Sequence, residues 1–233
     1  MSTQGLKSRA TPSALPPLEP GDHLTRDEFE RRFDATPGLK KAELIEGIVY
    51  LAPPVRIGSH AKPQMILVSW VCAYWAGTPG VSGGDNPSLR LDPDNEPQPD
   101  AMLYIEPACG GSARIEDDYV VGGPELVAEV SSSTVSFDLN TKFRVYQRNG
   151  IQEYLVWRVR DEEFDWFELR DGKYVRMTEP TDGVLRSNVF PGLWLDWRAL
   201  VRSDAAGVLD ALKQGMATEE HGAFVARLAS RKA

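Results

Sequence analysis

The 233-residue sequence contains little cysteine and no long apolar run. Its two cysteines, Cys72 and Cys109, are too few and too far apart for a disulfide framework or a thiolate metal site, which favours a reducing compartment. No stretch approaches the ~20 apolar residues of a membrane-spanning helix, and the first residues contain no apolar segment of signal-peptide length. We therefore expect a soluble, cytoplasmic protein without a membrane partner.

Positive charge is also in short supply. Lysine and arginine number 26 against 34 acidic residues, so the formal net charge is −8. This is the wrong sign for a protein that binds nucleic acid through its overall field, so such a partner must meet a local basic patch. The candidates for a basic rim are Arg31, Arg32, Lys40, Lys41, Arg56 and Lys62.

Several common catalytic motifs are missing: the sequence has no P-loop, no dinucleotide fingerprint with the right flanks, no HExxH and no CxxC. Residues 80–84 do spell G-x-S-x-G, the nucleophile elbow of serine hydrolases. That elbow needs a strand before the serine and a helix after it, whereas here a predicted helix precedes and Asp-Asn-Pro follows. We interpret these glycines as a bulge or a turn.

Length and composition predict one main domain with appendages. Residues 1–21 are rich in proline and show no apolar periodicity, which predicts a disordered leader. The main domain is expected over 22–190, and the helical pattern over 191–233 predicts a C-terminal appendage.

The main region mixes helical and strand patterns, so the fold class is α/β (α+β). Thr25 and Glu28 form a capping box that predicts a first helix, and Ser59 predicts the cap of a second. Glu46 and Gly47 predict the turn of an added β-hairpin over 43–51. Further patterns predict strands at 88–91, 100–105, 125–130 and 153–160, a helix at 138–148 and a hairpin at 163–177.

Two acids stand at the ends of predicted strands. Asp100 opens one strand, and Glu129 interrupts the end of a strand that looks buried. A carboxylate in a core strand is costly unless it is paired or binds a cation, and Mg²⁺ is satisfied by a few carboxylate and carbonyl oxygens. The two acids therefore predict either a shared metal ion or hydrogen-bonded groups at the sheet end.

A lysine on the following helix has two interpretations. Lys142 lies four residues after Asp138, which is the spacing of an i,i+4 salt bridge. The alternative is that the helix crosses the strand end and directs the ammonium into the acid pair, where it would stabilise an oxyanion. Sequence spacing leaves both open.

Among the other candidates, His60 begins the second predicted helix and is either a surface residue or part of the cleft. His23 and His221 are expected at the surface. Glu43 begins the hairpin and could line a cleft, whereas Glu46 belongs to a solvated turn.

An ordered set of blocks resembles the Uma family of putative restriction endonucleases, over roughly residues 25 to 180. These blocks are Glu43–Gly47, Pro53-Pro54, His60, Gln98-Pro99-Asp100, Gly123–Ser131, Ser133-Thr134, Asp138-Leu139, Lys142, Tyr146, Gly150 and Glu153-Tyr154. The resemblance implies the PD-(D/E)XK nuclease-like superfamily. It also implies a restriction-endonuclease-like mixed central sheet flanked by helices.

Carried over by position, the resemblance makes Asp100 the first acid and Glu129 the second, with the Val130 carbonyl completing the metal ligands. The superfamily lysine two residues after the second acid is replaced by Ser131, so Lys142 would supply that charge. Glu43 and His60 match further positions that line the same cleft. The implied cofactor is Mg²⁺, with Mn²⁺ as a substitute.

These observations lead to a hypothesis and its rivals. The chain would hydrolyse phosphodiester bonds of nucleic acid through a Mg-activated water, with DNA as the expected partner. The choice between DNA and RNA and the formation of a homodimer stay open. The alternative is a catalytically silent module of the same fold that binds nucleic acid or protein. A two-carboxylate glycosidase is a third, formal possibility.

Overall fold

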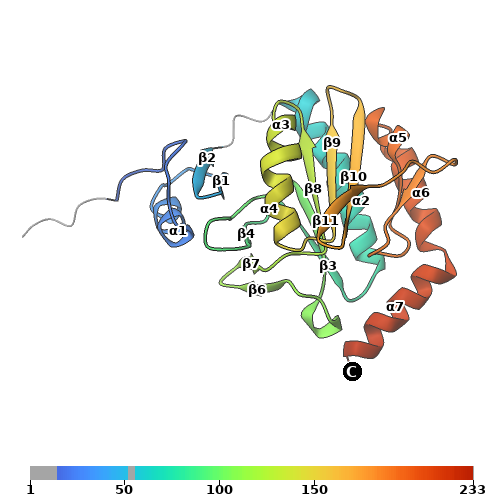
Figure 1. Ribbon diagram of the computed structural model, residues 1–233. Coiled ribbons are helices and arrows are strands. Elements are labelled where there is room, and N and C mark those ends of the chain that lie inside the picture. The colour runs from blue at the N-terminus through green and yellow to red at the C-terminus, as the bar shows by residue number, and fades with distance from the viewer. Residues whose placement is uncertain (1–14, 52–55, 233) are drawn as a thin grey trace, which may run out of the picture.

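A six-stranded mixed sheet organises the computed structural model, which describes residues 15–51 and 56–232 (Figure 1). The strand order is β11-β10-β9-β8-β5-β3, and every neighbouring pair is antiparallel except β8 with β9. The strands are β3 Val81–Asp85, β5 Ala101–Ile105, β8 Leu126–Ser131, β9 Glu153–Arg158, β10 Glu163–Arg170 and β11 Lys173–Arg176. The predicted mixed sheet flanked by helices is confirmed.

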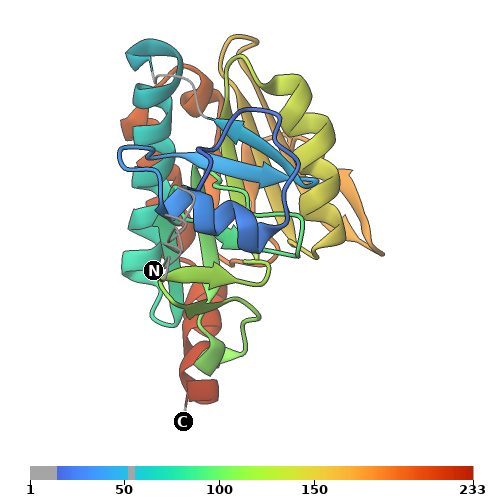
Figure 2. The ribbon, with the colours of Figure 1, turned by 90° about the vertical axis from the view of Figure 1, so that its left-hand side faces the viewer.

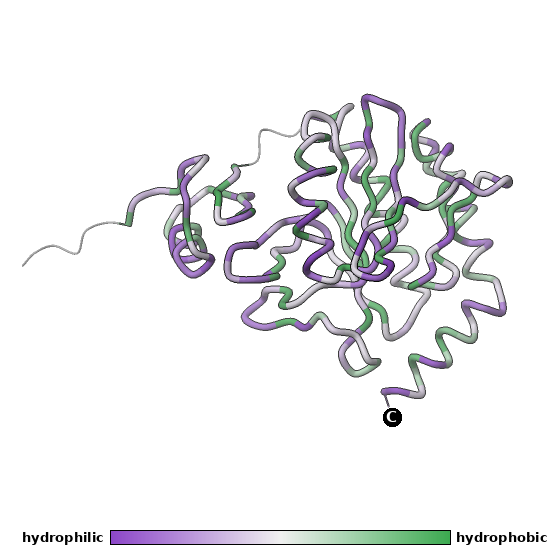
Figure 3. Tube along the Cα trace, viewed as in Figure 1, coloured by the Kyte–Doolittle hydropathy of each residue, from purple (hydrophilic) through white to green (hydrophobic). Residues whose placement is uncertain are grey.

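Helices cover both faces of this sheet, and Figure 2 shows α2 and α4 on opposite sides of it. Along β8, which is buried throughout, Leu126, Ala128 and Val130 belong to the core under α2 (Lys62–Gly77). Val127 belongs to the core on the other face, as does Tyr146 of α4 (Phe143–Arg148). Apolar residues are therefore concentrated in the central strands, as the hydropathy colouring in Figure 3 shows.

A continuous helical segment connects the two parallel strands. It consists of α3 (Val135–Phe137), a π-helical turn over Asp138–Lys142, and α4. Parallel neighbours cannot be joined by a tight turn, so the chain must cross a sheet face between them. The helix predicted at 138–148 is this crossover, and it begins three residues earlier than predicted.

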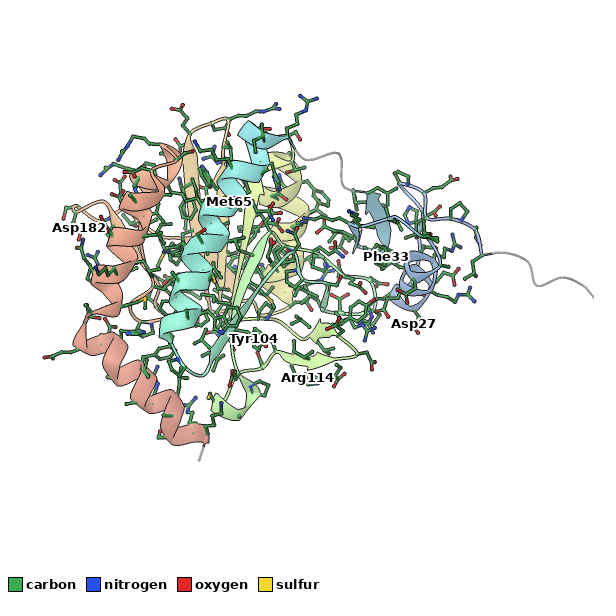
Figure 4. The ribbon with its side chains drawn as sticks, turned by 180° about the vertical axis from the view of Figure 1, so that it is seen from behind. Asp27, Phe33, Met65, Tyr104, Arg114 and Asp182 are labelled. Atoms are coloured by element: carbon green, nitrogen blue, oxygen red, sulfur yellow. The ribbon has the colours of Figure 1, made fainter. Side chains whose placement is uncertain are left out.

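The first helix and the hairpin form a small unit beside the sheet. Its elements are α1 Arg26–Asp34, β1 Ala42–Ile45 and β2 Ile48–Leu51. They share a core of their own that includes Phe29 and Leu44, and Figure 4 shows Asp27 and Phe33 of this unit to one side of α2. Glu46 and Gly47 have φ of 54° and 72°, the left-handed pair that a type I′ turn requires, so the predicted hairpin is confirmed.

Both predicted helix caps are wrong in mechanism. Thr25 precedes α1 but its side chain makes no capping hydrogen bond, because Glu28 turns to Arg31 and Arg32 instead. Ser59 lies inside a π-helical turn (Ile57–Ala61) that leads directly into α2, so it caps nothing.

The glycines at 80–84 have two different roles. Gly80 lies in the turn before β3, at φ 95°, as predicted, whereas Gly83 and Gly84 belong to the edge strand β3 and are a further correction. A Cβ at Gly83 would lie 2.8 Å from the Met102 carbonyl oxygen. The close approach of the two backbones requires glycine. Ser82 lies within this strand, so the dismissal of a nucleophile elbow stands.

Short strands and helices complete the chain. The remaining elements are β4 Leu89–Arg90, β6 Arg114–Glu116, β7 Tyr119–Val121, β12 Val184–Arg186, β13 Trp194–Asp196, the 3₁₀ turn Pro107–Cys109, α5 Trp197–Val201, α6 Ala205–Met216 and α7 Glu219–Lys232. The pair β6 and β7 and the strand β12 lie where the sequence predicted no strand, and β13 lies at the start of the stretch 191–233 that was predicted to be helical.

The two predicted appendages differ from the structure where they are described. Residues 1–14 of the leader lie outside the described residues, but Leu18 is buried in the core of the hairpin unit. At the other end, Leu212 of α6 and Phe224 of α7 belong to the largest core cluster. His221, expected at the surface, is 6% exposed, and its ring nitrogens contact the Thr78 hydroxyl and the Met216 carbonyl.

Replacing Phe224 by alanine tests whether α7 is part of the domain core. Because Phe224 is 2% exposed, we expect Phe224→Ala to lower the free energy of unfolding by about 3–5 kcal/mol in a single urea transition. Exposed Glu220→Ala on the same helix is the control and should change stability by less than about 0.5 kcal/mol. A loss of α7 without a change in the main transition would show an independent appendage.

A buried acid at the start of β9 makes stability depend on pH. Glu153 is fully buried and accepts hydrogen bonds from the Ser187 hydroxyl at 2.7 Å and the Asn188 amide at 2.9 Å. Burial raises the pKa of Glu153 from its ordinary 4.5 to about 7, although these hydrogen bonds oppose the change. The folded protein therefore favours the protonated carboxyl.

We expect this group to stabilise the fold below pH 4.5 and to lose that contribution as the pH rises through about 7. Glu153→Gln keeps the hydrogen-bonding shape and removes the titration. The difference in unfolding free energy between variant and wild type should therefore grow, in favour of the variant, by on the order of 3 kcal/mol across that interval. A difference that is constant with pH would contradict the assignment.

Candidate functional site

The register of the central strands brings the two predicted acids side by side. Ala101 pairs with Ala128, so Asp100 and Glu129 follow as the next neighbours across β5 and β8. Beyond that point the Asp100 side chain replaces the backbone ladder, because its Oδ2 accepts the Val130 amide at 2.8 Å. Asp100 is 2% and Glu129 4% exposed, so two carboxylates are buried at one strand junction.

The crossover helix places Lys142 and Tyr146, one turn apart, over this junction. Lys142 Nζ lies 2.9 Å from Glu129 Oε1, and the Tyr146 hydroxyl donates to the same oxygen at 2.8 Å. Asp138 is not an ion-pair partner of Lys142; it accepts a hydrogen bond from Thr134 instead, at 2.6 Å. Of the two interpretations of Lys142, the structure therefore has the one that directs its ammonium to the acid pair.

The hairpin contributes a third acid. Glu43 Oε1 lies 2.7 Å from Lys142 Nζ and accepts the Gln98 amide, also at 2.7 Å. The Lys142 ammonium thus lies between Glu43 and Glu129 and is 4% exposed. Glu46 lies in the turn, as predicted, and pairs with Arg148 at 2.5 Å.

A histidine and a lysine also contact Asp100. His60 Nε2 lies 3.4 Å and Lys41 Nζ 3.1 Å from Asp100 Oδ1. The structure therefore gathers Asp100, Glu129, Lys142, Glu43 and His60 in one cluster. The sequence predicted Lys41 in the basic rim and not among the site residues. The signal that could have identified it is the alternation of the hairpin strand, in which residues 41 and 43 share a face.

Charges within the cluster are strongly coupled. Burial would raise the pKa of Asp100, but contact with His60 and the Lys41 charge outweigh it and lower that pKa to about 2. The hydrogen bond with Asp100 raises the pKa of His60, against the effect of burial. Burial raises the pKa of Glu129 to about 8, despite the neighbouring Lys142 charge.

Lys142 itself remains cationic. Burial alone would lower its pKa, but Glu129 and Glu43 outweigh that and hold it well above its ordinary value. One ammonium thus compensates for two carboxyl groups, while burial favours a proton on Glu129. A second cation near Glu129 would remove that preference.

The donor set fits a divalent cation only in part. No group of three or more His, Cys, Asp or Glu side chains within 15–51 and 56–232 has the arrangement of a ready-made metal site. However, both hydrogen bonds that the described residues give Glu129 go to Oε1, which leaves its Oε2 without one. Two carboxylates and the Val130 carbonyl, completed by water and substrate oxygens, are sufficient ligands for Mg²⁺ or Mn²⁺.

Fold and site together define a class: a nuclease-like α/β protein whose clustered acids lie at the junction of two central strands. Residues 26–198 match the Uma2 family, described as putative restriction endonuclease, and the chain belongs to that family. The resemblance inferred from the sequence is confirmed. The match ends within α5, so α6 and α7 lie beyond it.

The solved structures include a similar fold. The crystal structure of a putative nuclease belonging to DUF820 from Anabaena variabilis ATCC 29413 aligns with a TM-score of 0.56 and 17% sequence identity. The alignment covers 76% of this chain and 99% of that one. No curated protein matches the chain. No helix in the described part of the chain is long and apolar enough to cross a membrane.

Removing the Lys142 charge tests the electrostatics of the cluster. Lys142→Met leaves Glu43 and Glu129 buried without their shared cation, so we expect a loss of about 3–5 kcal/mol in unfolding free energy. Adding Glu129→Gln to that variant should recover part of the loss, since one of the two uncompensated acids is then neutral. Strictly additive effects in urea denaturation would contradict the coupling.

Proposed function

We propose that the chain is a metal-dependent endonuclease of the PD-(D/E)XK type that hydrolyses phosphodiester bonds in DNA. The observation that carries this proposal is the position of Asp100 next to Glu129, with the Lys142 ammonium 2.9 Å from Glu129. Acid, acid and lysine come from strand, strand and crossover helix, in the order that membership of a family of putative restriction endonucleases leads one to expect.

Asp100, Glu129 and the Val130 carbonyl would hold Mg²⁺ or Mn²⁺. Such an ion supplies a Lewis acid for a phosphoryl oxygen and lowers the pKa of water. Asp100 is suited to this role because it stays ionised, and Glu129 because its Oε2 faces no hydrogen-bond donor among the described residues. The hydrogen bond from the Val130 amide to Oδ2 further fixes the Asp100 carboxylate.

Lys142, Glu43 and Tyr146 position Glu129, and Lys142 balances its charge. Lys142 and the Tyr146 hydroxyl hold one oxygen of Glu129, while Glu43 holds Lys142 from the hairpin side. The ammonium also offsets negative charge that develops on a phosphate bound over the acids. His60, whose side chain is 24% exposed beside Asp100, is the group placed to contact that phosphate.

The predicted basic rim is smaller in the structure than in the sequence. Arg31 and Arg32 pair with Glu28, and Lys41 pairs with Asp100. Exposed cations that remain along the hairpin and the start of α2 are Lys40, Arg56 and Lys62. Lys40 precedes Glu43 in the chain, while Arg56 precedes and Lys62 follows His60. These three side chains would supply local positive charge on a protein of net charge −8.

A catalytically silent module is the second candidate. The observation in its favour is that each buried acid already has a cation from its own chain: Lys41 for Asp100 and Lys142 for Glu129. Acids neutralised in this way can be purely structural. Calorimetry separates the candidates, because the module should give no heat with millimolar Mg²⁺ or Mn²⁺ while its DNA binding weakens as salt rises.

The glycosidase alternative has no support in the family or the fold. Both acids are buried and engaged by cations.

Cleavage of nucleic acid tests the proposal. Purified protein should nick supercoiled plasmid in the presence of Mg²⁺ or Mn²⁺, and Asp100→Asn or Glu129→Gln should reduce cleavage to background. Glu43→Gln, which weakens the positioning of Lys142 and changes no proposed metal ligand, should cost about 10–100-fold. The matched control is the exposed, remote Asp210→Asn, which should cleave like wild type.

Parallel assays on single-stranded RNA decide the substrate class. Cleavage that persists in Asp100→Asn would indicate a contaminating nuclease. Absence of cleavage with either ion on either nucleic acid, by protein that unfolds cooperatively, would overturn the endonuclease assignment.

A further inference from the structure

Asp100 and Glu129 are compensated by cations of very different character. Lys142 lies between two carboxylates, receives support from Tyr146 as a co-donor to Glu129, and is 4% exposed. Lys41 contacts a single carboxylate, Asp100, and its side chain is 26% exposed. The first cation is enclosed by the fold, whereas the second has an open path to solvent.

A polar chain holds Lys41 in place. Lys41 Nζ donates to Asn86 Oδ1 at 2.5 Å as well as contacting Asp100. The Asn86 amide nitrogen is engaged by Asp85 Oδ1 at 2.7 Å, and the same oxygen accepts Gln64 Nε2 of α2 at 2.8 Å. The Asn86 carbonyl oxygen is therefore turned toward the lysine.

The backbone at Asn86 supports this arrangement. Its φ is 50°, in the left-handed region that asparagine tolerates better than most residues. The loop after β3 thus presents a fixed acceptor beside Asp100. Ordering an exposed lysine costs side-chain entropy. Its two acceptors, Asn86 and Asp100, offset this cost and stabilise the ordered position of Lys41.

We propose that Lys41 is an exchangeable counterion of Asp100 that a divalent cation must displace, and that the hydrogen bond to Asn86 helps to retain Lys41 in this position. The proposal rests on the proposed function, since it concerns the cation for which Asp100 is a ligand. Without a metal ion, Lys41 supplies the positive charge that a buried carboxylate requires. When a metal ion binds, two cations on one carboxylate repel, and the ammonium leaves along its exposed side.

The exchange also indicates where the released Lys41 ammonium goes. Lys41 directly precedes β1, two residues before Glu43, and its chain neighbour Lys40 is exposed. A flexible four-carbon stem lets the released charge reach a nearby phosphate. Binding of the metal ion would therefore strengthen binding of a phosphodiester, and the reverse, because each removes a competitor of the other.

Isothermal titration with Mn²⁺ in the absence of nucleic acid tests the competition. Lys41→Met keeps the length of the side chain and removes its charge, so we expect its Kd for Mn²⁺ to be about tenfold lower than that of wild type. Asn86→Ala should change Kd in the same direction by a smaller factor. Lys40→Met, one residue away and exposed, is the control and should bind like wild type.

The gain must depend on the shared carboxylate. Adding Asp100→Asn to Lys41→Met should abolish the tighter binding. Equal Kd values for wild type, Lys41→Met and Lys40→Met would overturn the exchange while leaving the endonuclease assignment intact. Tighter Mn²⁺ binding by Lys41→Met in a protein that never cleaves nucleic acid would overturn the endonuclease assignment and leave the exchange intact.

Labelling of wild-type protein provides a readout that needs no variant. An amine-reactive acylating reagent, followed by peptide mass spectrometry, should modify Lys41 faster when Mn²⁺ is present. Lys142 should stay unmodified in both conditions, because it is enclosed. An unchanged or slower rate at Lys41 would overturn the proposal, and so would an absence of Mn²⁺ binding by every variant.

Discussion

The cost of burying carboxylates at the junction of β5 and β8 is the constraint on which the rest of the site depends. Asp100 and Glu129 are almost entirely removed from solvent, and an isolated ionised carboxylate in that position would cost several kcal/mol. The chain meets this cost with groups from three directions: a backbone amide of β8, an ammonium from the crossover helix, and charged side chains from the N-terminal hairpin. Elements distant in sequence are thereby held at one point.

Topology explains how a lysine thirteen residues after Glu129 reaches its carboxyl group. The central pair β8 and β9 is parallel, so the chain must cross the sheet face between them, and this crossing carries Lys142 and Tyr146 above Glu129. The residue two positions after the second acid, Ser131, instead contacts Thr134 at 3.3 Å. The positive charge beside Glu129 is thus supplied by a helix rather than by β8 itself.

Much of the central sheet could be predicted from sequence because its signals are local. The apolar run of β8, the Glu46-Gly47 turn and the helix over 138–148 each follow from periodicity or turn chemistry. What local patterns could not supply was the competition between partners. Glu28 pairs with arginines instead of capping α1, and Asp138 accepts a hydrogen bond from a threonine instead of pairing with Lys142. Lys41 contacts a buried acid instead of lying in the basic rim.

Strands β12 and β13 and the burial of His221 were missed for a related reason, since only tertiary contacts with α2 and α6 determine them. Gly83 was assigned to a bulge or turn, but it lies in a strand. A side chain is excluded there by the neighbouring Met102 carbonyl oxygen and not by the φ of Gly83.

The hairpin unit has a core separate from the two clusters that flank the main sheet. Proteins open locally in cooperative units, and a small unit with its own core opens at a lower free energy than the whole domain. Residues 41 and 43 travel with this unit, so each such opening withdraws Lys41 from Asp100 and Glu43 from Lys142 in one event. The lifetime of the assembled site is thus set by the opening of this unit, which amide hydrogen exchange in β1 and β2 reports, rather than by the acids themselves.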